Sequence, residues 1–175
     1  MRETLGYPAL SGETNYMRYL RSLWDFSDAG GFAAQPADVV KLMPIQIPWT
    51  VTVDRVVLDI RVSAGNVCVG IYRNNGNQPD GGALVVESAS LGAGGLGWTH
   101  YTIASTQLTR GLYWLAYNNS NGTLQCNNPG AGQNNGGTLF ARSYNLAFGA
   151  FTNPCPVTIA SAIVSVGWVR VASIP

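Results

Sequence analysis

The chain has 175 residues, which suits one domain with a core large enough to need no cross-links. Hydrophobic residues make up 46% of it and charged residues only 11%. This composition argues against intrinsic disorder, which goes with low hydrophobicity and high net charge. A net charge of +1 without a basic run argues against a nucleic-acid-binding protein. Since no apolar run reaches about 18 residues, we expect no membrane span, and the first residues, MRETLGYP, have no apolar segment typical of a secretory signal.

The first 43 residues carry the helix-like pattern of the chain. Residues 14–26, TNYMRYLRSLWDF, have apolar side chains at the spacing of one helix face. These side chains are Tyr16, Met17, Leu20, Leu23 and Trp24. Because so short a helix is not stable alone, we expect this face to lie on the following domain or on another chain. We therefore predict an N-terminal arm, residues 1–43, followed by one domain, residues 44–175.

After residue 42 the pattern becomes that of β-strands. Residues 51–62, VTVDRVVLDIRV, alternate, and the parity switches between Val53 and Val56, which predicts a bulge at Asp54 and Arg55. Further strands are expected at 66–72, 83–90, 98–105, 111–118 and 163–172, with weaker ones at 123–126, 138–141 and 157–160. Loops rich in Asn and Gly separate them. This predicts an all-β fold, an antiparallel β-sandwich of the jelly-roll type that follows an arm with a short helix.

The strand at residues 111–117, GLYWLAY, is apolar on both faces. Alternation places Leu112, Trp114 and Ala116 on one face, and the other face carries Tyr113, Leu115 and Tyr117. We therefore expect a central strand that is covered on both sides.

Residues that could carry enzyme chemistry are sparse. No Asp or Glu follows Glu87, and His100 is the only histidine. Asp54 and Asp59 would face opposite sides of a regular strand, which is unsuited to a glycosidase pair. The three cysteines, Cys68, Cys126 and Cys155, contain no C-x-x-C pair, so we expect no zinc site and at most one disulfide. We expect a non-enzymatic protein without catalytic residues, metal or cofactor.

The loop within residues 70–82, GIYRNNGNQPDGG, has two interpretations. Its polar side chains could bind a ligand, and the candidates are Asn74, Asn75, Asn77 and Asp80. A calcium site normally draws on several carboxylates, however, and this loop has one. The favoured interpretation is a corner between two strands, because Asn and Gly accept left-handed backbone conformations and Pro79-Asp80-Gly81 suits a tight turn. The glycines of residues 92–97 are likewise expected to form a hairpin connection, since no helix follows them to hold a phosphate.

Aromatic side chains on the expected strands also have two interpretations. They are Trp98, Tyr101, Tyr113, Trp114, Tyr117 and Trp168. Core packing is favoured for most of them, and the alternative is a platform on which a sugar stacks.

Three stretches resemble β-sandwich domains of bacteriophage virion proteins: residues 51–62, residues 69–84 (VGIYRNNGNQPDGGAL) and residues 108–117 (LTRGLYWLAY). In those domains a strand of the TVDRI type leads to a G-I-Y-x-(D/N)-N-G-x-P-G loop, and an L-x-x-G-x-Y-W-L-A strand comes later. The resemblance spans about residues 43–118. It implies a virion structural protein on the outer surface of the particle, assembled in the host cytoplasm, and it brings no catalytic residues.

An arm followed by one sandwich is the layout expected of a capsid decoration, or cement, protein. The implied partners are the phage major capsid protein and further copies of the chain, since homotrimers are common in this class. The apolar side chains of the arm would make the capsid or subunit contact, and binding would stabilise the capsid. The alternative is a tail-fibre or tail-tip module that recognises host-surface glycan, with Trp98 or Trp168 as the stacking residue.

Overall fold

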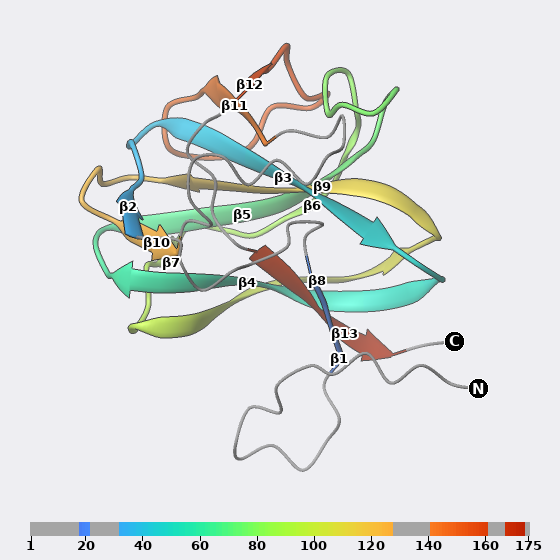
Figure 1. Ribbon diagram of the computed structural model, residues 1–175, viewed down its shortest axis with the longest axis horizontal. Helices are drawn as coiled ribbons and strands as arrows, with labels where there is room; N and C mark the ends of the chain where they lie inside the picture. The colour runs from blue at the N-terminus through green and yellow to red at the C-terminus, as the bar shows by residue number, and fades with distance from the viewer. Residues whose placement is uncertain (1–17, 22–31, 128–140, 161–166, 174–175) are drawn as a thin grey trace.

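The structure is a computed structural model that describes residues 18–21, 32–127, 141–160 and 167–173 (Figure 1). These residues form two antiparallel sheets and no helix. Sheet A consists of β1 (Arg18–Arg21), β13 (Gly167–Ser173), β4 (Val51–Val62), β8 (Gly97–Leu108), β10 (Gln125–Asn127) and β2 (Phe32–Ala34). Sheet B consists of β12 (Ile159–Ala160), β11 (Arg142–Asn145), β3 (Val39–Ile47), β9 (Gly111–Asn119), β5 (Asn66–Arg73), β6 (Leu84–Glu87) and β7 (Leu91–Gly92). The prediction of an all-β, antiparallel fold is confirmed.

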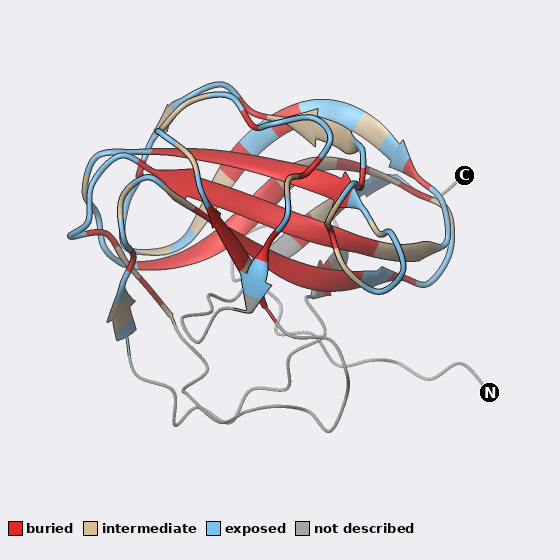
Figure 2. Cartoon of the chain, turned by 90° about the horizontal axis from the view of Figure 1, so that it is seen from above, coloured by how far each residue is buried: buried red, intermediate tan, exposed pale blue. Residues whose placement is uncertain are grey.

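The main hydrophobic core lies between the two sheets. β4 is central in sheet A, with β8 along one edge and β13 followed by β10 along the other. Its inward side chains Val56, Leu58 and Ile60 belong to the same buried cluster as Met43 and Ile45 of β3. Figure 2 shows the central strands buried along most of their length. Burial of apolar surface between two faces of alternating strands therefore holds the sheets together.

A second core covers the outer face of sheet B. Trp114 and Ala116 of β9 pack there with Tyr144, Phe151 and Cys155 from the chain that follows β9. On the opposite face of β9, Tyr113, Leu115 and Tyr117 belong to the main core. The prediction of a central strand covered on both faces is confirmed, and the cover on the outer side is the described segment 141–160, which crosses above sheet B in Figure 1.

The predicted bulge in β4 is also confirmed. Relative to β13, β4 has one extra residue, Asp54, because Val53 lies opposite Val171 and Arg55 lies opposite Arg170. The pairing with β8 is also irregular at this level, but there the additional residues are in β8. Asp54 faces Arg170 of β13: Oδ1 accepts a hydrogen bond of 2.7 Å from Nε, and Oδ2 pairs with Nη2. This hydrogen bonding with the Arg170 guanidinium lowers the pKa of Asp54 below its usual range.

We expect Asp54→Asn to lower the free energy of unfolding at neutral pH by about 1 to 2 kcal/mol, as for a charge-assisted hydrogen bond. The pKa of Asp54 is lower in the folded chain than its ordinary value of 3.8 in the unfolded chain. The ion pair therefore stabilises the folded chain at pH values above 3.8. That contribution is lost as the pH falls through the folded pKa. Urea unfolding at several pH values should therefore show wild type and variant converging in acid, and a difference that stays constant with pH would contradict this assignment.

β3 was not among the strands expected from the sequence, because Pro44 interrupts its pattern. Proline cannot donate a hydrogen bond to a neighbouring strand and is disfavoured in central strands. β9 pairs with β3 from Lys41 to Ile47, whereas β11 pairs only with Val39 to Leu42. At Pro44, therefore, β3 pairs with β9 on one edge, and no described strand pairs with its other edge. The boundary expected between arm and domain, residues 43 and 44, falls inside this strand.

The predicted helix over residues 14–26 is wrong at residues 18–21, which form β1. This strand pairs antiparallel with β13, with Leu20 opposite Val169, and Leu20 is only 7% exposed and belongs to the main core. The physical reason is that a short isolated helix has little stability of its own, whereas the edge of β13 offers backbone hydrogen bonds and a hydrophobic contact. The other arm candidates, Tyr16, Met17, Leu23 and Trp24, lie outside the described residues. No described segment forms a helix long and apolar enough to cross a membrane.

Candidate functional site

The loop after β5 is closed by its own hydrogen bonds. The backbones of Asn75 and Gln78 bond to each other, N to O, at 2.8 and 3.3 Å, and the Asn75 side chain donates to the Asp80 carbonyl at 2.9 Å. Gly82 N donates to Pro79 O at 2.7 Å. Asn77 has a φ of 68°, in the left-handed region that Asn tolerates. The geometry is that of a tight corner between β5 and β6, as the favoured interpretation predicts.

The same loop is fastened to the segment that covers sheet B. Gly81 N donates to Cys155 O at 2.8 Å and Cys155 N donates to Gly82 O at 2.9 Å, which resembles a short piece of strand pairing. The Thr158 hydroxyl donates to Asp80 Oδ1. The corner therefore positions the segment that completes the second core.

Three of the four proposed ligand-loop residues use their side chains in hydrogen bonds within the fold. Asn74 Oδ1 accepts a hydrogen bond of 3.0 Å from Trp114 Nε1, and Asp80 accepts from Thr158. Asn75 bonds within the loop, and Asn77 is exposed. No hydrogen bond joins the side chains of any two of these four residues. Within the described residues, no three His, Cys, Asp or Glu side chains lie close enough together to hold a metal ion.

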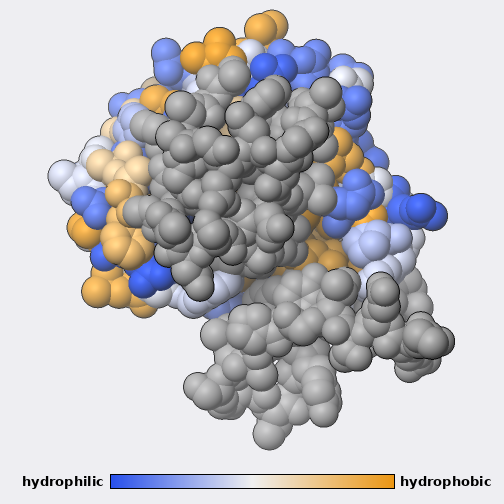
Figure 3. Space-filling model, in the orientation of Figure 1, coloured by the Kyte–Doolittle hydropathy of each residue, from blue (hydrophilic) through white to orange (hydrophobic). Residues whose placement is uncertain are grey.

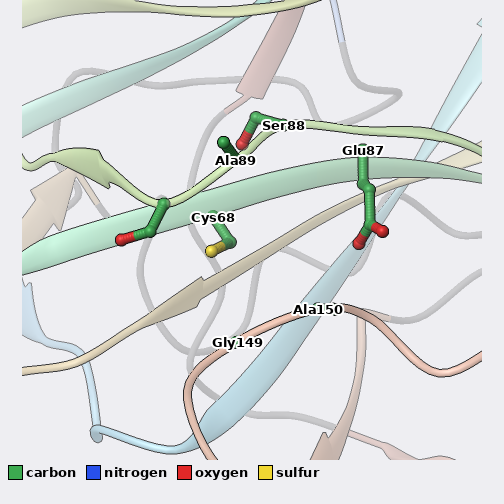
Figure 4. Close-up of a pocket in the computed structure, with 7 residues that line it drawn as sticks. Cys68, Glu87, Ser88, Ala89, Gly149 and Ala150 are labelled. Atoms are coloured by element: carbon green, nitrogen blue, oxygen red, sulfur yellow. The ribbon is translucent and has the colours of Figure 1, made fainter.

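A pocket of about 360 Å³ opens beside the second core, between β5 and the covering segment (Figure 4). Its lining includes Cys68, Glu87, Ser88, Gly149 and Ala150. Two of the polar groups already serve the fold: Glu87 Oε2 accepts from Phe151 N at 2.8 Å, and Ser88 Oγ accepts from Val69 N at 3.0 Å. Burial and, second, the Glu87 charge raise the pKa of Cys68, so its thiol stays protonated and a poor nucleophile.

None of the three cysteines forms a disulfide, and all three are buried. Burial first, and the charge of Asp80 second, raise the pKa of Cys155 to about 12. Since the thiolate is the reactive form, we expect an aromatic disulfide reagent to label none of the three within minutes at neutral pH, and all three after addition of denaturant. Fast labelling of one cysteine in the folded chain would show that the hydrophobic core around that cysteine becomes exposed to solvent readily.

A different group of side chains gathers on the outer face of sheet A. Asp59 lies near the end of β4, directly opposite Trp98 at the start of β8. Asp59 Oδ2 accepts hydrogen bonds of 2.9 Å from Arg61 and 3.1 Å from Asn127 of β10. The Arg61 guanidinium lies 4.8 Å from the centre of the Phe32 ring, on β2. We call these five residues the end cluster; it spans four neighbouring strands, at the left of the molecule in Figure 1.

The end cluster includes two of the large hydrophobic side chains that are exposed in the described part, Phe32 and Trp98. Hydrophobic and hydrophilic residues are interspersed along the left margin of the molecule in the space-filling view (Figure 3). A mixed polar and aromatic surface of this kind is typical of recognition sites.

Four of the other aromatic residues expected on strands are core residues, as predicted. Tyr101, Tyr113, Trp114 and Tyr117 are buried, and the Tyr101 hydroxyl donates to Ala93 O at 2.8 Å. Trp168 lies on β13, and its side chain is outside the description. His100 is half-buried on β8, opposite Val57.

Sequence reasoning noted Asp59 and Trp98 separately but missed the end cluster. Phe32 and Asn127 are far from both in the chain, and their proximity depends on the pairing of β10 with β2 and with β4. Comparison of the chain with protein-family models, with curated proteins and with solved structures finds no match.

Proposed function

We propose that this protein is a non-enzymatic virion structural protein that binds the outer surface of a phage head as a decoration protein and stabilises it. The observation that carries the proposal is the resemblance of residues 51–62, 69–84 and 108–117 to virion β-sandwich domains. Those stretches are β4, the β5 corner and β9, which are the centres of the two sheets and the connection that anchors the covering segment. The resemblance therefore involves residues that specify the fold, and a jelly-roll type of sandwich is part of the proposal.

The roles of three of the described carboxylates support a structural function. Asp54 pairs with Arg170, Glu87 accepts from Phe151 N, and Asp38 accepts from Phe148 N at 2.8 Å. Each of them joins two distant segments of the chain. Groups used in this way stabilise a fold and are poorly placed to transfer protons to a substrate.

The arm is proposed as the contact with the major capsid protein or with further copies in a homotrimer. Tyr16, Met17, Leu23 and Trp24 would supply the apolar contact, with Trp24 as an anchor of the kind that dominates interfaces. Leu20 is already in the core of its own chain, so its role is to hold β1 against β13.

The experiment that tests this function is to locate the protein in purified phage particles by cryo-electron microscopy. We expect density for the two sheets on the outside of the capsid, and purified protein should bind expanded heads and raise their resistance to heat. As a matched pair, Trp24→Ala should lose binding to heads, whereas Trp49→Ala, at an exposed tryptophan outside the arm, should keep it. Absence of the protein from the head would overturn the proposal.

A second candidate is a tail-fibre or tail-tip module that recognises host-surface glycan. The observation that favours it is the end cluster, where exposed aromatic rings flank a carboxylate, a guanidinium and an amide.

A further inference from the structure

We propose that the pocket between β5 and the covering segment is a binding site for an organic cation, a primary ammonium or guanidinium group on a short alkyl stem, with Glu87 as its counter-ion. The inference goes beyond the two candidate functions and depends on neither of them. It concerns a part of the molecule that includes neither the arm nor the end cluster.

The pocket is open to solvent and has room for a small ligand. Its volume of about 360 Å³ lies at the lower end of the range for small-molecule sites. One wall is formed by Cys68 of β5 and by residues 87–90, where β6 ends; the other wall is formed by Gly149 and Ala150 of the covering segment. In Figure 4 the side chains of Cys68 and Glu87 extend from the first wall toward the second. A ligand that enters between the walls therefore meets the carboxylate.

Glu87 provides a negative charge and an accessible acceptor. Its Oε2 accepts a hydrogen bond of 2.8 Å from Phe151 N, which fixes the carboxylate at the wall of the pocket. Nothing in the described part donates to Oε1, which is not a buried atom. Asp54 and Asp59 pair with arginine side chains, whereas no described Lys or Arg side chain pairs with Glu87. The pocket thus offers a carboxylate oxygen that the described fold leaves unused.

The charge of the pocket favours a cation over a neutral or anionic ligand. Among the lining residues only Glu87 and Cys68 can ionise, and burial, followed by the Glu87 charge, raises the pKa of Cys68 so that its thiol is neutral. A carboxylate partly withdrawn from water without a counter-ion has lost hydration, and a bound cation compensates for that loss. An N–H group of the cation would also make a charge-assisted hydrogen bond to Oε1, which is stronger than a neutral one.

The other lining residues indicate an organic cation and not a metal ion. Ca²⁺ and Mg²⁺ take about six oxygen ligands or more, whereas this pocket has one carboxylate. Cys68, Ala89 and Ala150 instead offer apolar surface, along which an alkyl stem can pack. The Ser90 hydroxyl lines the pocket as a further acceptor for the several N–H donors of an ammonium or guanidinium group.

The test is titration of the full chain with n-butylammonium and n-butylguanidinium chloride, followed by ¹H–¹⁵N correlation spectra. We expect at least one of the two cations to bind, with chemical-shift changes concentrated at the amides of the pocket lining. The control ligand is n-butanol, which has the same stem without a charge and should bind about tenfold more weakly or worse, as for loss of a hydrogen bond to a charged group.

The same chemistry can come from a free amine or guanidine or from the side chain of a partner protein. Acetyl-Ala-Lys-Ala-amide and acetyl-Ala-Arg-Ala-amide carry the two groups on a polypeptide. Binding of either peptide at the pocket would assign the site to a partner's side chain, and binding of the free cations alone would assign it to a small molecule.

Glu87→Gln is the informative substitution, because it removes the charge and keeps an oxygen that can accept from Phe151 N. We expect it to weaken cation binding about tenfold or more. Asp38→Asn is the matched control: Asp38 also accepts a hydrogen bond of 2.8 Å from the covering segment, at Phe148 N, but does not line the pocket. It should leave the affinity unchanged. Ala89→Leu leaves Glu87 intact, narrows the pocket and should also weaken binding, with folding of each variant verified by circular dichroism.

Three results would overturn the inference. They are the absence of cation-induced shifts at the pocket amides, equal binding of n-butanol and the cations, and wild-type affinity in Glu87→Gln. None of these results bears on the decoration function, which is tested separately on phage heads.

Discussion

Replacement of Trp114 by Ala is expected to lower the free energy of unfolding by about 3 to 5 kcal/mol, the range for loss of a large aromatic side chain from a core. Trp114 is fully buried in the second core. Its indole N–H donates to Asn74, so the substitution removes both the packing around the ring and a hydrogen bond to the β5 corner. The loss should therefore loosen the covering segment as well as sheet B.

Urea denaturation followed by far-ultraviolet circular dichroism measures this loss. Trp49→Ala is the appropriate control, since Trp49 is partly exposed and its replacement should cost much less. Hydrogen exchange should increase at the amides of Gly81 and Cys155, which join the corner to the covering segment. A loss below about 1 kcal/mol for Trp114→Ala would mean that the outer face of sheet B is not a true core.

Replacement of Gly82 by Ala is expected to be similarly damaging, at about 3 kcal/mol or more, for a steric reason. A Cβ atom on Gly82 would lie 2.1 Å from the carbonyl oxygen of Arg73 and 2.8 Å from that of Pro79. Both obstacles are backbone atoms. The backbone could move away only by breaking the hydrogen bonds that Gly82 makes with Pro79 and Cys155.

Gly95→Ala is the control for this substitution. Nothing lies within 4 Å of a Cβ built at Gly95, and its backbone is not left-handed, so we expect a change within about 0.5 kcal/mol. The comparison is made in thermal and urea unfolding of both variants. Equal free energies of unfolding for Gly82→Ala and Gly95→Ala would contradict the close approach of the Arg73 and Pro79 carbonyl oxygens to Gly82.

The two candidate functions depend on different residues. The decoration proposal depends on Trp24 of the arm, and the glycan-binding candidate depends on Trp98 of β8. We therefore expect Trp24→Ala to lower binding to heads and Trp98→Ala to lower binding to glycan.

Local alternation was sufficient to predict the strands at the centre of each sheet. In residues 51–62 the change of parity at Asp54 marked the bulge against β13, because side chains of a strand alternate and one extra residue reverses the order. In residues 111–117 apolar side chains on both faces indicated that both faces are buried, although they did not indicate which segments cover them. The corner at residues 74–82 followed from the conformational freedom of Asn and Gly. These features depend on neighbouring residues only.

Other features depend on partners that are distant in the chain. β3 contains a proline at a level where one of its edges has no partner among the described strands, and residues 18–21 form a strand because β13 lies beside them. The end cluster has the same origin: Asp59, Trp98, Asn127 and Phe32 come from four strands whose register sets their contacts. The sequence by itself thus determined an all-β, charge-poor chain with its bulge, its corner and its twice-buried strand. Tertiary structure alone decided which side chains meet, because strand pairing joins residues through backbone hydrogen bonds that local sequence does not specify.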